Sequence, residues 1–142
     1  MVGMVVLMML LLPTANAETG EGKVALIAAK GSGIEEMSIR NVRRVYLGLK
    51  SVDSVAVKNP VLNVQSRVLY DEFLKNTMHM TEGSYKRKLV KRMFRQGGEK
   101  IEEVSSLKEL NDHLLEHVGD ISFIEVSFID SMESIEVIQI LW

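Results

Sequence analysis

The chain has 142 residues, with 17 basic and 19 acidic side chains that give a formal net charge of −2 at pH 7. It contains no cysteine, which excludes disulfide bonds, thiol catalysis and cysteine-ligated zinc sites. The near-neutral total hides an uneven distribution: residues 18–100 hold 16 basic and 9 acidic residues, whereas residues 101–142 hold 1 basic and 10 acidic residues. Such a division creates a field across a domain when the two segments face different ways.

Residues 1–17 have the features of a secretory signal peptide. They contain no Asp, Glu, Lys or Arg, residues 2–12 are almost wholly apolar, and residues 15–17 (Ala-Asn-Ala) have the small-x-small pattern of a cleavage site. An apolar run of about eleven residues is shorter than the roughly twenty that cross a bilayer. We therefore expect cleavage after Ala17, no stable membrane span afterwards, and a single domain over residues 18–142. The alternative is a retained anchor or a buried helix. An exported chain without disulfides suits the bacterial periplasm.

The first elements of the domain are a strand and a helix. Residues 23–29 form a continuous apolar run between glycines and predict a buried strand. Ser38 is the expected cap of a helix that ends near Gly48, with an apolar stripe at Ile39, Val42, Val45, Tyr46 and Leu49. Residues 54–58 then read as an edge strand or an extended connection, because Pro60 follows closely.

A strand that turns directly into a helix occupies the centre of the sequence. We expect the strand at residues 61–64 and the helix at residues 66–77. Thr81 is the expected cap of a third helix that ends at the glycine pair 97–98. Its predicted buried stripe consists of Tyr85, Leu89, Met93 and Phe94.

The last third predicts a helix and two strands. Ser106 and Glu109 form a capping box that opens a helix with an apolar face at Leu107, Leu110, Leu114 and Val118. Residues 121–126 predict a strand, residues 127–134 a connection, and residues 135–142 a last strand buried on both faces. Alternating strands and helices indicate a layered α/β/α sandwich with a mainly parallel or mixed sheet.

Two motifs give the chain a resemblance to a known family. Residues 45–48 (Val-Tyr-Leu-Gly) are similar to the Ile-Phe-Leu-Gly signature of the periplasmic phosphate-binding proteins of ABC transporters, and residues 119–125 resemble that family's Gly-x-Ile-Gly-Tyr-Val-Glu strand. The resemblance covers residues 38–126 and implies one lobe of a type 2 periplasmic-binding-protein-like fold. The family's glycine-rich phosphate loop would fall on residues 61–66, which contain no glycine. A loop without glycine approaches an oxyanion less closely.

The strand-to-helix turn is the first candidate binding site. The backbone N–H groups at a helix start attract anions, Ser66 can donate its hydroxyl, and Arg67 offers a charged fork. We expect phosphate or a similar oxyanion to bind at Gln65, Ser66 and Arg67, with Arg40 or Arg44 completing the site. In the simpler reading, Ser66 is only a helix cap and Arg67 is solvated.

Two further clusters are interpreted as surface features. The basic residues between Lys86 and Arg95 predict a solvated helix face, or else a surface for an acidic partner or a membrane. Export and the lack of interleaved aromatic residues argue against nucleic acid. Glu109, His113 and His117 recur at four-residue steps, but a stable metal site needs further ligands, so we expect surface histidines and no metal.

The expected function is that of a binding module. No catalytic triad context or glycine-flanked nucleophile is present, so we expect neither enzymatic activity nor a cofactor. The leading hypothesis is an exported solute-binding-like protein that binds phosphate or a similar oxyanion for an ABC transporter. The alternative is a periplasmic interaction or assembly protein that has kept the lobe and lost the ligand, and that docks on a protein partner or a second copy.

Overall fold

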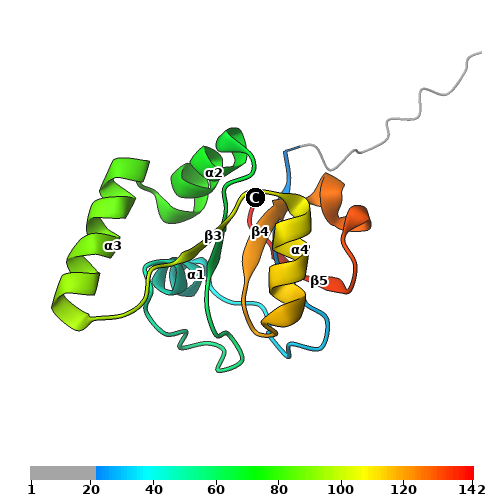
Figure 1. The fold of residues 1–142 in the computed structure, drawn as a ribbon, viewed down its shortest axis with the longest axis horizontal. Coiled ribbons are helices and arrows are strands. Elements are labelled where there is room, and N and C mark those ends of the chain that lie inside the picture. The colour runs from blue at the N-terminus through cyan, green and yellow to red at the C-terminus, as the bar shows by residue number, and fades with distance from the viewer. Residues whose placement is uncertain (1–21) are drawn as a thin grey trace, which may run out of the picture.

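The computed structural model describes residues 22–142, a mixed α/β fold shown in Figure 1. The predicted signal peptide, residues 1–17, lies outside the described residues. Within residues 22–142, none of the helices has the length and apolar character that crossing a membrane requires.

The strands form two small sheets. In the first, β1 (Val24–Ala29) lies between β4 (Ser122–Glu125) and β5 (Ile135–Ile140) and is antiparallel to both. In the second, β2 (Val61–Asn63) pairs in parallel with β3 (Glu102–Val104). The sheets meet at a parallel bridge, where the Val61 N–H donates to the Ile121 carbonyl at 2.8 Å. The α/β class is confirmed, but the strands form two small sheets, and the larger one is antiparallel throughout instead of mainly parallel or mixed.

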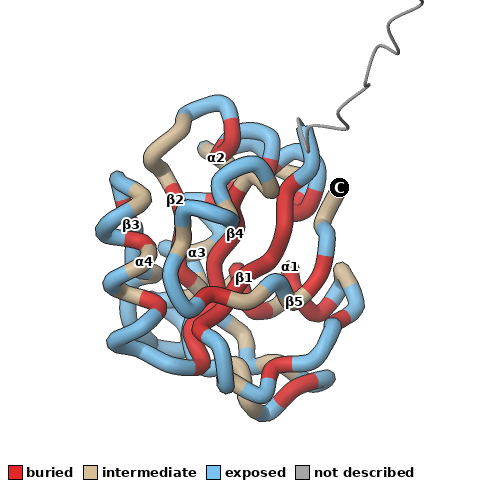
Figure 2. The backbone as a smooth tube through the Cα atoms, turned by 90° about the vertical axis from the view of Figure 1, so that its right-hand side faces the viewer, coloured by how far each residue is buried: buried red, intermediate tan, exposed pale blue. Residues whose placement is uncertain are grey.

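Helices cover both faces of β1, which is buried along its whole length, as Figure 2 shows. Leu26 and Ala28 belong to the core cluster that includes residues of α1 (Ile39–Tyr46) and α2 (Arg67–Phe73). Ala25 and Ile27 belong to the opposite cluster, which includes residues of α4 (Leu107–Glu116). An apolar run without alternation is what a strand covered on both faces requires, and the predicted buried strand is confirmed.

Three aromatic rings form the centre of the larger core. Phe73 of α2 stacks on Phe123 of β4 with ring centroids 3.8 Å apart, and Tyr46 of α1 meets Phe73 edge-on at 4.8 Å. All three side chains are fully buried. These rings therefore join two helices to the central sheet.

Each predicted helix cap is observed. The side-chain oxygens of four hydroxyl residues accept a hydrogen bond from the backbone N–H three residues later, at 3.1–3.2 Å. This interaction satisfies one of the unpaired donors at each helix start. The four caps are Ser38, Ser66, Thr81 and Ser106.

The second and third helices have the predicted starts but differ in detail. The helix that begins with α2 continues as a π-helical segment, Leu74–Met78, and ends at His79 with a positive φ of 55°. The third helix, α3 (Glu82–Gln96), ends at Gly97 as predicted. Of its predicted buried stripe, only Tyr85 is fully buried, whereas Met93 and Phe94 are exposed. That part of the prediction is wrong because the end of α3 extends beyond the sheets (Figure 1).

Two predictions about extended segments are wrong, and one short strand was not predicted. Residues 54–58 contain a turn and no strand. The Lys58 N–H donates to the Gly119 carbonyl, but this single bond does not form a strand. The short acidic strand β3 was not predicted. The last strand, β5, exposes Val137 and Ile140, so it is not buried on both faces as predicted. It follows a 3₁₀ segment, Val126–Ser131, in the predicted connection. Val118 lies beyond the end of α4 and is exposed as well.

Candidate functional site

The turn between β2 and α2 has the predicted course, but its side chains interact with one another. The Ser66 hydroxyl oxygen accepts the Leu69 N–H at 3.2 Å, and the Gln65 N–H donates to the Asn63 side-chain oxygen at 3.2 Å. Asn63 is fully buried, and its amide also donates to the Phe123 carbonyl at 3.0 Å. These bonds fix the turn from within, and Ser66 acts as the helix cap.

Arg67 is held by two carboxylates. Its guanidinium donates to Asp71 at 3.2 Å and also to Glu82 at the start of α3. Hydrogen bonds from Arg67 and then from Lys86 lower the pKa of the Glu82 carboxyl, so Glu82 is ionised at neutral pH. An incoming anion would therefore compete with two negative charges for Arg67.

The other two arginines that we expected to complete this site do not join it. Among residues 22–142, no hydrogen bond or ion pair links Arg40 or Arg44 to the turn. The Arg44 Nε is buried without a hydrogen-bond partner, and the neighbouring Arg43 donates to the Thr77 carbonyl at 2.7 Å. The predicted group of Gln65, Ser66 and Arg67 is thus together in space, without a further cation bound to it.

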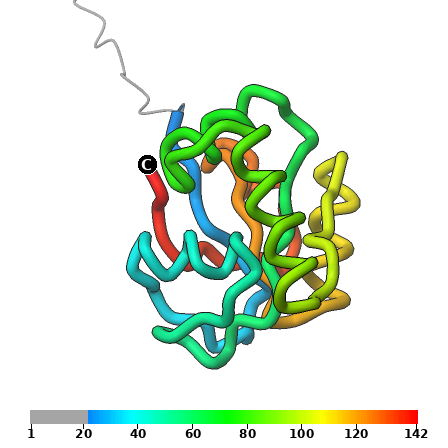
Figure 3. Tube along the Cα trace, turned by 90° about the vertical axis from the view of Figure 1, so that its left-hand side faces the viewer, coloured from blue at the N-terminus to red at the C-terminus, as the bar shows by residue number. Residues whose placement is uncertain are grey.

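A groove of about 940 Å³ lies beside α3. Figure 3 views the molecule from this side, with α3 outermost in front of the strands. Apolar side chains of α1, β2 and α3 contribute to its lining, among them Val45, Leu62 and Leu89. Its polar lining is mixed in charge and includes Lys50, Lys58, Lys100, Glu99, Glu102 and Glu103.

Buried contacts anchor α3 to the body by one face. The Tyr85 hydroxyl donates to the Tyr46 carbonyl at 2.6 Å, and burial raises the pKa of Tyr85, so the phenol stays protonated as a donor. Farther along, the Arg92 guanidinium donates to the Leu47 carbonyl. The opposite face is left free for contacts with other molecules.

That free face of α3 is both basic and apolar. Phe94 is 88% exposed, Val90 50% and Met93 41%. Of the six basic residues of α3, only Lys86 pairs with a carboxylate within residues 22–142, at 2.7 Å from Glu82. The cations without such a pair include Arg87, Lys88, Lys91 and Arg95.

Part of the acidic third of the chain lies away from α3, although Glu102 and Glu103 of β3 line the groove beside it. In Figure 1, α3 and the 3₁₀ segment after β4 are at opposite ends of the long axis.

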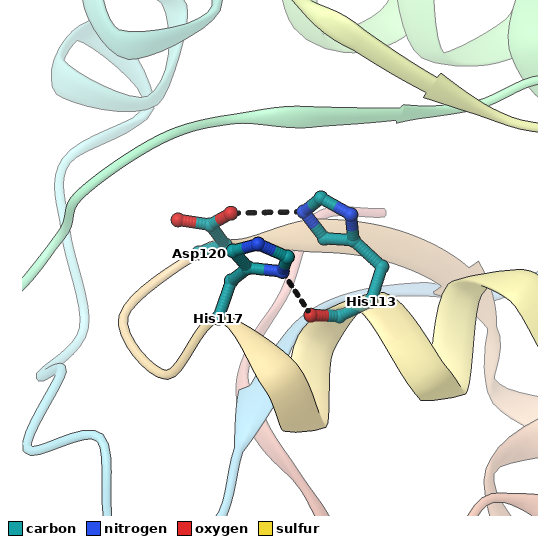
Figure 4. Close-up of side chains that lie close together, drawn as sticks. All are labelled: His113, His117 and Asp120. Atoms are coloured by element: carbon teal, nitrogen blue, oxygen red, sulfur yellow. Dashed lines mark hydrogen bonds and ion pairs between the residues drawn. The ribbon is translucent and has the colours of Figure 1, made fainter.

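A cluster of two histidines and an aspartate lies at one end of the groove (Figure 4). His113 Nε2 donates to Asp120 Oδ2 at 2.9 Å, and the His113 and His117 rings stack with centroids 4.4 Å apart. The sequence pairs the histidines at helical spacing, but it does not show that the turn after α4 brings Asp120 back beside them. The backbone bond from the Asp120 N–H to the His117 carbonyl, 3.0 Å, closes that turn.

No protein-family model and no curated protein matches this sequence.

Proposed function

We propose that this chain is an exported, non-enzymatic binding module that binds an acidic segment of a partner protein along the outer face of α3, with the apolar side chains of that segment at the edge of the adjoining groove. The observation that carries the proposal is the outer face of α3, where four cations without a carboxylate partner in residues 22–142 lie on the same helix as exposed apolar side chains. Apolar surface of this kind beside charge is typical of recognition surfaces. Charge complementarity then favours an acidic partner.

The shape of the surface favours a polypeptide over a membrane. The lining of the groove includes Val90 and Met93, two exposed apolar side chains of α3. A bilayer surface would meet only the outer side of α3, whereas a chain segment can lie along the cations there and also place its apolar side chains in the groove. We therefore commit to a protein segment that carries both carboxylates and apolar anchors.

The proposal also covers the detailed fold of the domain and its cellular compartment. We propose a single α/β/α lobe similar to one lobe of type 2 periplasmic-binding proteins, located in the periplasm, that has exchanged ligand binding for protein binding. The helices on both faces of β1 support the layered arrangement. The engagement of Ser66 as a cap and of Arg67 by two carboxylates supports the loss of the ligand.

A synthetic peptide in which Glu and Leu alternate tests this proposal. We expect it to shift the amide NMR signals of α3 and of the groove, and we expect a peptide with Lys in place of Glu not to do so. Replacing Arg87, Lys88 and Lys91 by glutamate should weaken binding at least about tenfold. Loss of three exposed charge pairs at about 0.5 kcal/mol each removes about 1.5 kcal/mol of binding free energy, which corresponds to about that factor. Lys75→Glu, an exposed cation outside α3, is the control and should leave the affinity unchanged.

Other occupants give different results in the same experiments. Equal binding of both peptides would contradict charge recognition. Binding to anionic phospholipid vesicles without binding to the acidic peptide would replace the protein partner by a membrane. Sedimentation that shows salt-sensitive self-association would identify the acidic end of a second copy as the occupant.

Oxyanion binding at the β2–α2 turn, in the service of an ABC transporter, is the second candidate function. One observation favours it: Ser66 starts α2 as predicted, and the Arg67 side chain, although paired, is 65% exposed to solvent. Phosphate could therefore reach the guanidinium by displacing Asp71.

Thermal unfolding in phosphate, sulfate and chloride at matched ionic strength tests the second candidate. A ligand at a hundred times its dissociation constant adds about 2.7 kcal/mol, which raises the melting temperature by several degrees. The expected signature is a phosphate-selective rise that Arg67→Ala removes and Lys75→Ala does not. Equal small responses to the three salts would exclude this candidate.

A further inference from the structure

We infer that His113, His117 and Asp120 form a binding site for one divalent transition-metal ion, of which Zn²⁺ is the best match. The inference does not rest on the proposed function, because it uses only these three side chains and their immediate surroundings. Two imidazoles and one carboxylate are ligand types that Zn²⁺ accepts, with a fourth position left for water.

The distances between the ligand atoms suit a shared ion after one small adjustment. The ligand atoms of the three residues all lie within 4.8 Å of one another. Ligands about 2.0–2.2 Å from a tetrahedral ion lie about 3.4 Å apart. The 2.9 Å between His113 Nε2 and Asp120 Oδ2 is within that reach, and the ion would take the place of the proton between these two atoms. His117 is exposed, so its ring can turn toward the ion without repacking the core.

Hydrogen bonds already orient two of the three ligands. His117 Nδ1 donates to the His113 carbonyl at 3.1 Å, which leaves the Nε2 lone pair free for a metal. Asp120 Oδ1 accepts the Asn59 side-chain amide at 3.4 Å, so the second carboxylate oxygen is supported from another segment. A backbone carbonyl behind a histidine, and a polar group behind a carboxylate, are the outer contacts that metal ligands usually make.

Burial makes the site more than a group of surface side chains. The Asp120 side chain is only 6% exposed and that of His113 17%. A carboxylate at this depth needs a positive partner, and a metal ion would supply more charge than a single imidazolium. Lys58 packs against Gly119 and also lines the groove, so its positive charge lies near the proposed ion and opposes its binding.

The fourth coordination position opens into the groove, since all three ligands line it. Water, or a carboxylate from another molecule, can complete the coordination there. This position distinguishes the site from a closed structural zinc centre, in which protein ligands occupy all four positions.

Titration of the untagged, metal-free protein with ZnCl₂ tests the inference by calorimetry and by the imidazole nitrogen signals in NMR. The expected result is one Zn²⁺ per chain, with both His113 and His117 signals shifted. His117→Asn should weaken binding by more than about 100-fold, because loss of an outer contact alone costs about 10–100-fold. Asn59→Ala should weaken it by about tenfold by the same reasoning.

His79→Asn is the matched control, since it removes the remaining histidine of the chain at a positive-φ position that asparagine tolerates. It should leave Zn²⁺ affinity unchanged. His117 is exposed, so His117→Asn should keep the fold, which circular dichroism checks. The inference is overturned if no saturable binding occurs, if the imidazole signals do not move, or if His117→Asn binds Zn²⁺ as tightly as the parent and the His79→Asn control.

Discussion

Replacing Phe73 by alanine should lower the free energy of unfolding by about 3–5 kcal/mol. Phe73 is fully buried, stacks on Phe123 with ring planes 6° apart, and meets the edge of Tyr46. Its removal would leave a cavity among two helices and the central sheet, which the remaining rings cannot fill without leaving their packed positions. Urea unfolding followed by circular dichroism measures the loss as a lower midpoint at an unchanged slope.

Phe94→Ala provides the matched control for that measurement. The same change of side chain at a position that is 88% exposed should alter stability by no more than about 0.5 kcal/mol. Equal losses at the two positions would mean that the end of α3 is packed against the body, and would remove the free surface on which the proposed function depends.

The helix starts could be predicted from the sequence because a cap is a local interaction. A hydroxyl side chain bonds to a backbone N–H three residues away, so the sequence contains both partners. The same holds for the buried strand β1, where six consecutive apolar residues need cover on two faces. The capping box at Ser106 and Glu109 differs from the expected one in a single hydrogen bond. The Glu109 carboxylate accepts the Ser105 N–H at 2.9 Å instead of the Ser106 N–H.

The side chains that were wrongly predicted as buried depend on what lies opposite them. Met93 and Phe94 follow the helical period of a core stripe, but the period cannot tell where the helix runs past the end of the sheets. The exposure of Val137 and Ile140 was missed for a similar reason. A run of apolar residues does not show whether both faces of its strand are covered. Strand β3 has only three residues, two of them acidic, and pairing with β2 rather than propensity makes it a strand.

The candidate sites were predictable only as far as their members are neighbours in sequence. Gln65, Ser66 and Arg67 are adjacent, so their grouping was certain, whereas the pairing of Arg67 with Glu82 spans 15 residues. His113 and His117 were recognised by their helical spacing. Asp120 was missed because its position depends on a reversal of the chain at Gly119, where φ is +106°.

Gly119→Ala should destabilise the protein by about 1–3 kcal/mol, the usual cost of holding a side chain in a disfavoured backbone conformation. A Cβ at Gly119 would lie 3.0 Å from the Ala56 carbonyl oxygen and 2.9 Å from the Lys58 side chain. The lysine can move, but the carbonyl belongs to the backbone beside the bond from the Lys58 N–H to the Gly119 carbonyl. Relief of the contact therefore requires a shift of the turn that carries Asp120.

Gly83→Ala is the matched control, because Gly83 lies in the first turn of α3, where an added Cβ meets only the Arg87 side chain at 3.5 Å. Alanine there should stabilise the protein by about 0.4–1 kcal/mol, since it restricts the unfolded chain without strain. Thermal unfolding of both variants distinguishes the two effects by sign. If Gly119→Ala were as stable as the parent, the turn would be free to relax, and the fixed position of Asp120 beside the two histidines would no longer explain the site. Loss of stability at Gly119 with a gain at Gly83 is the result that a rigid turn requires.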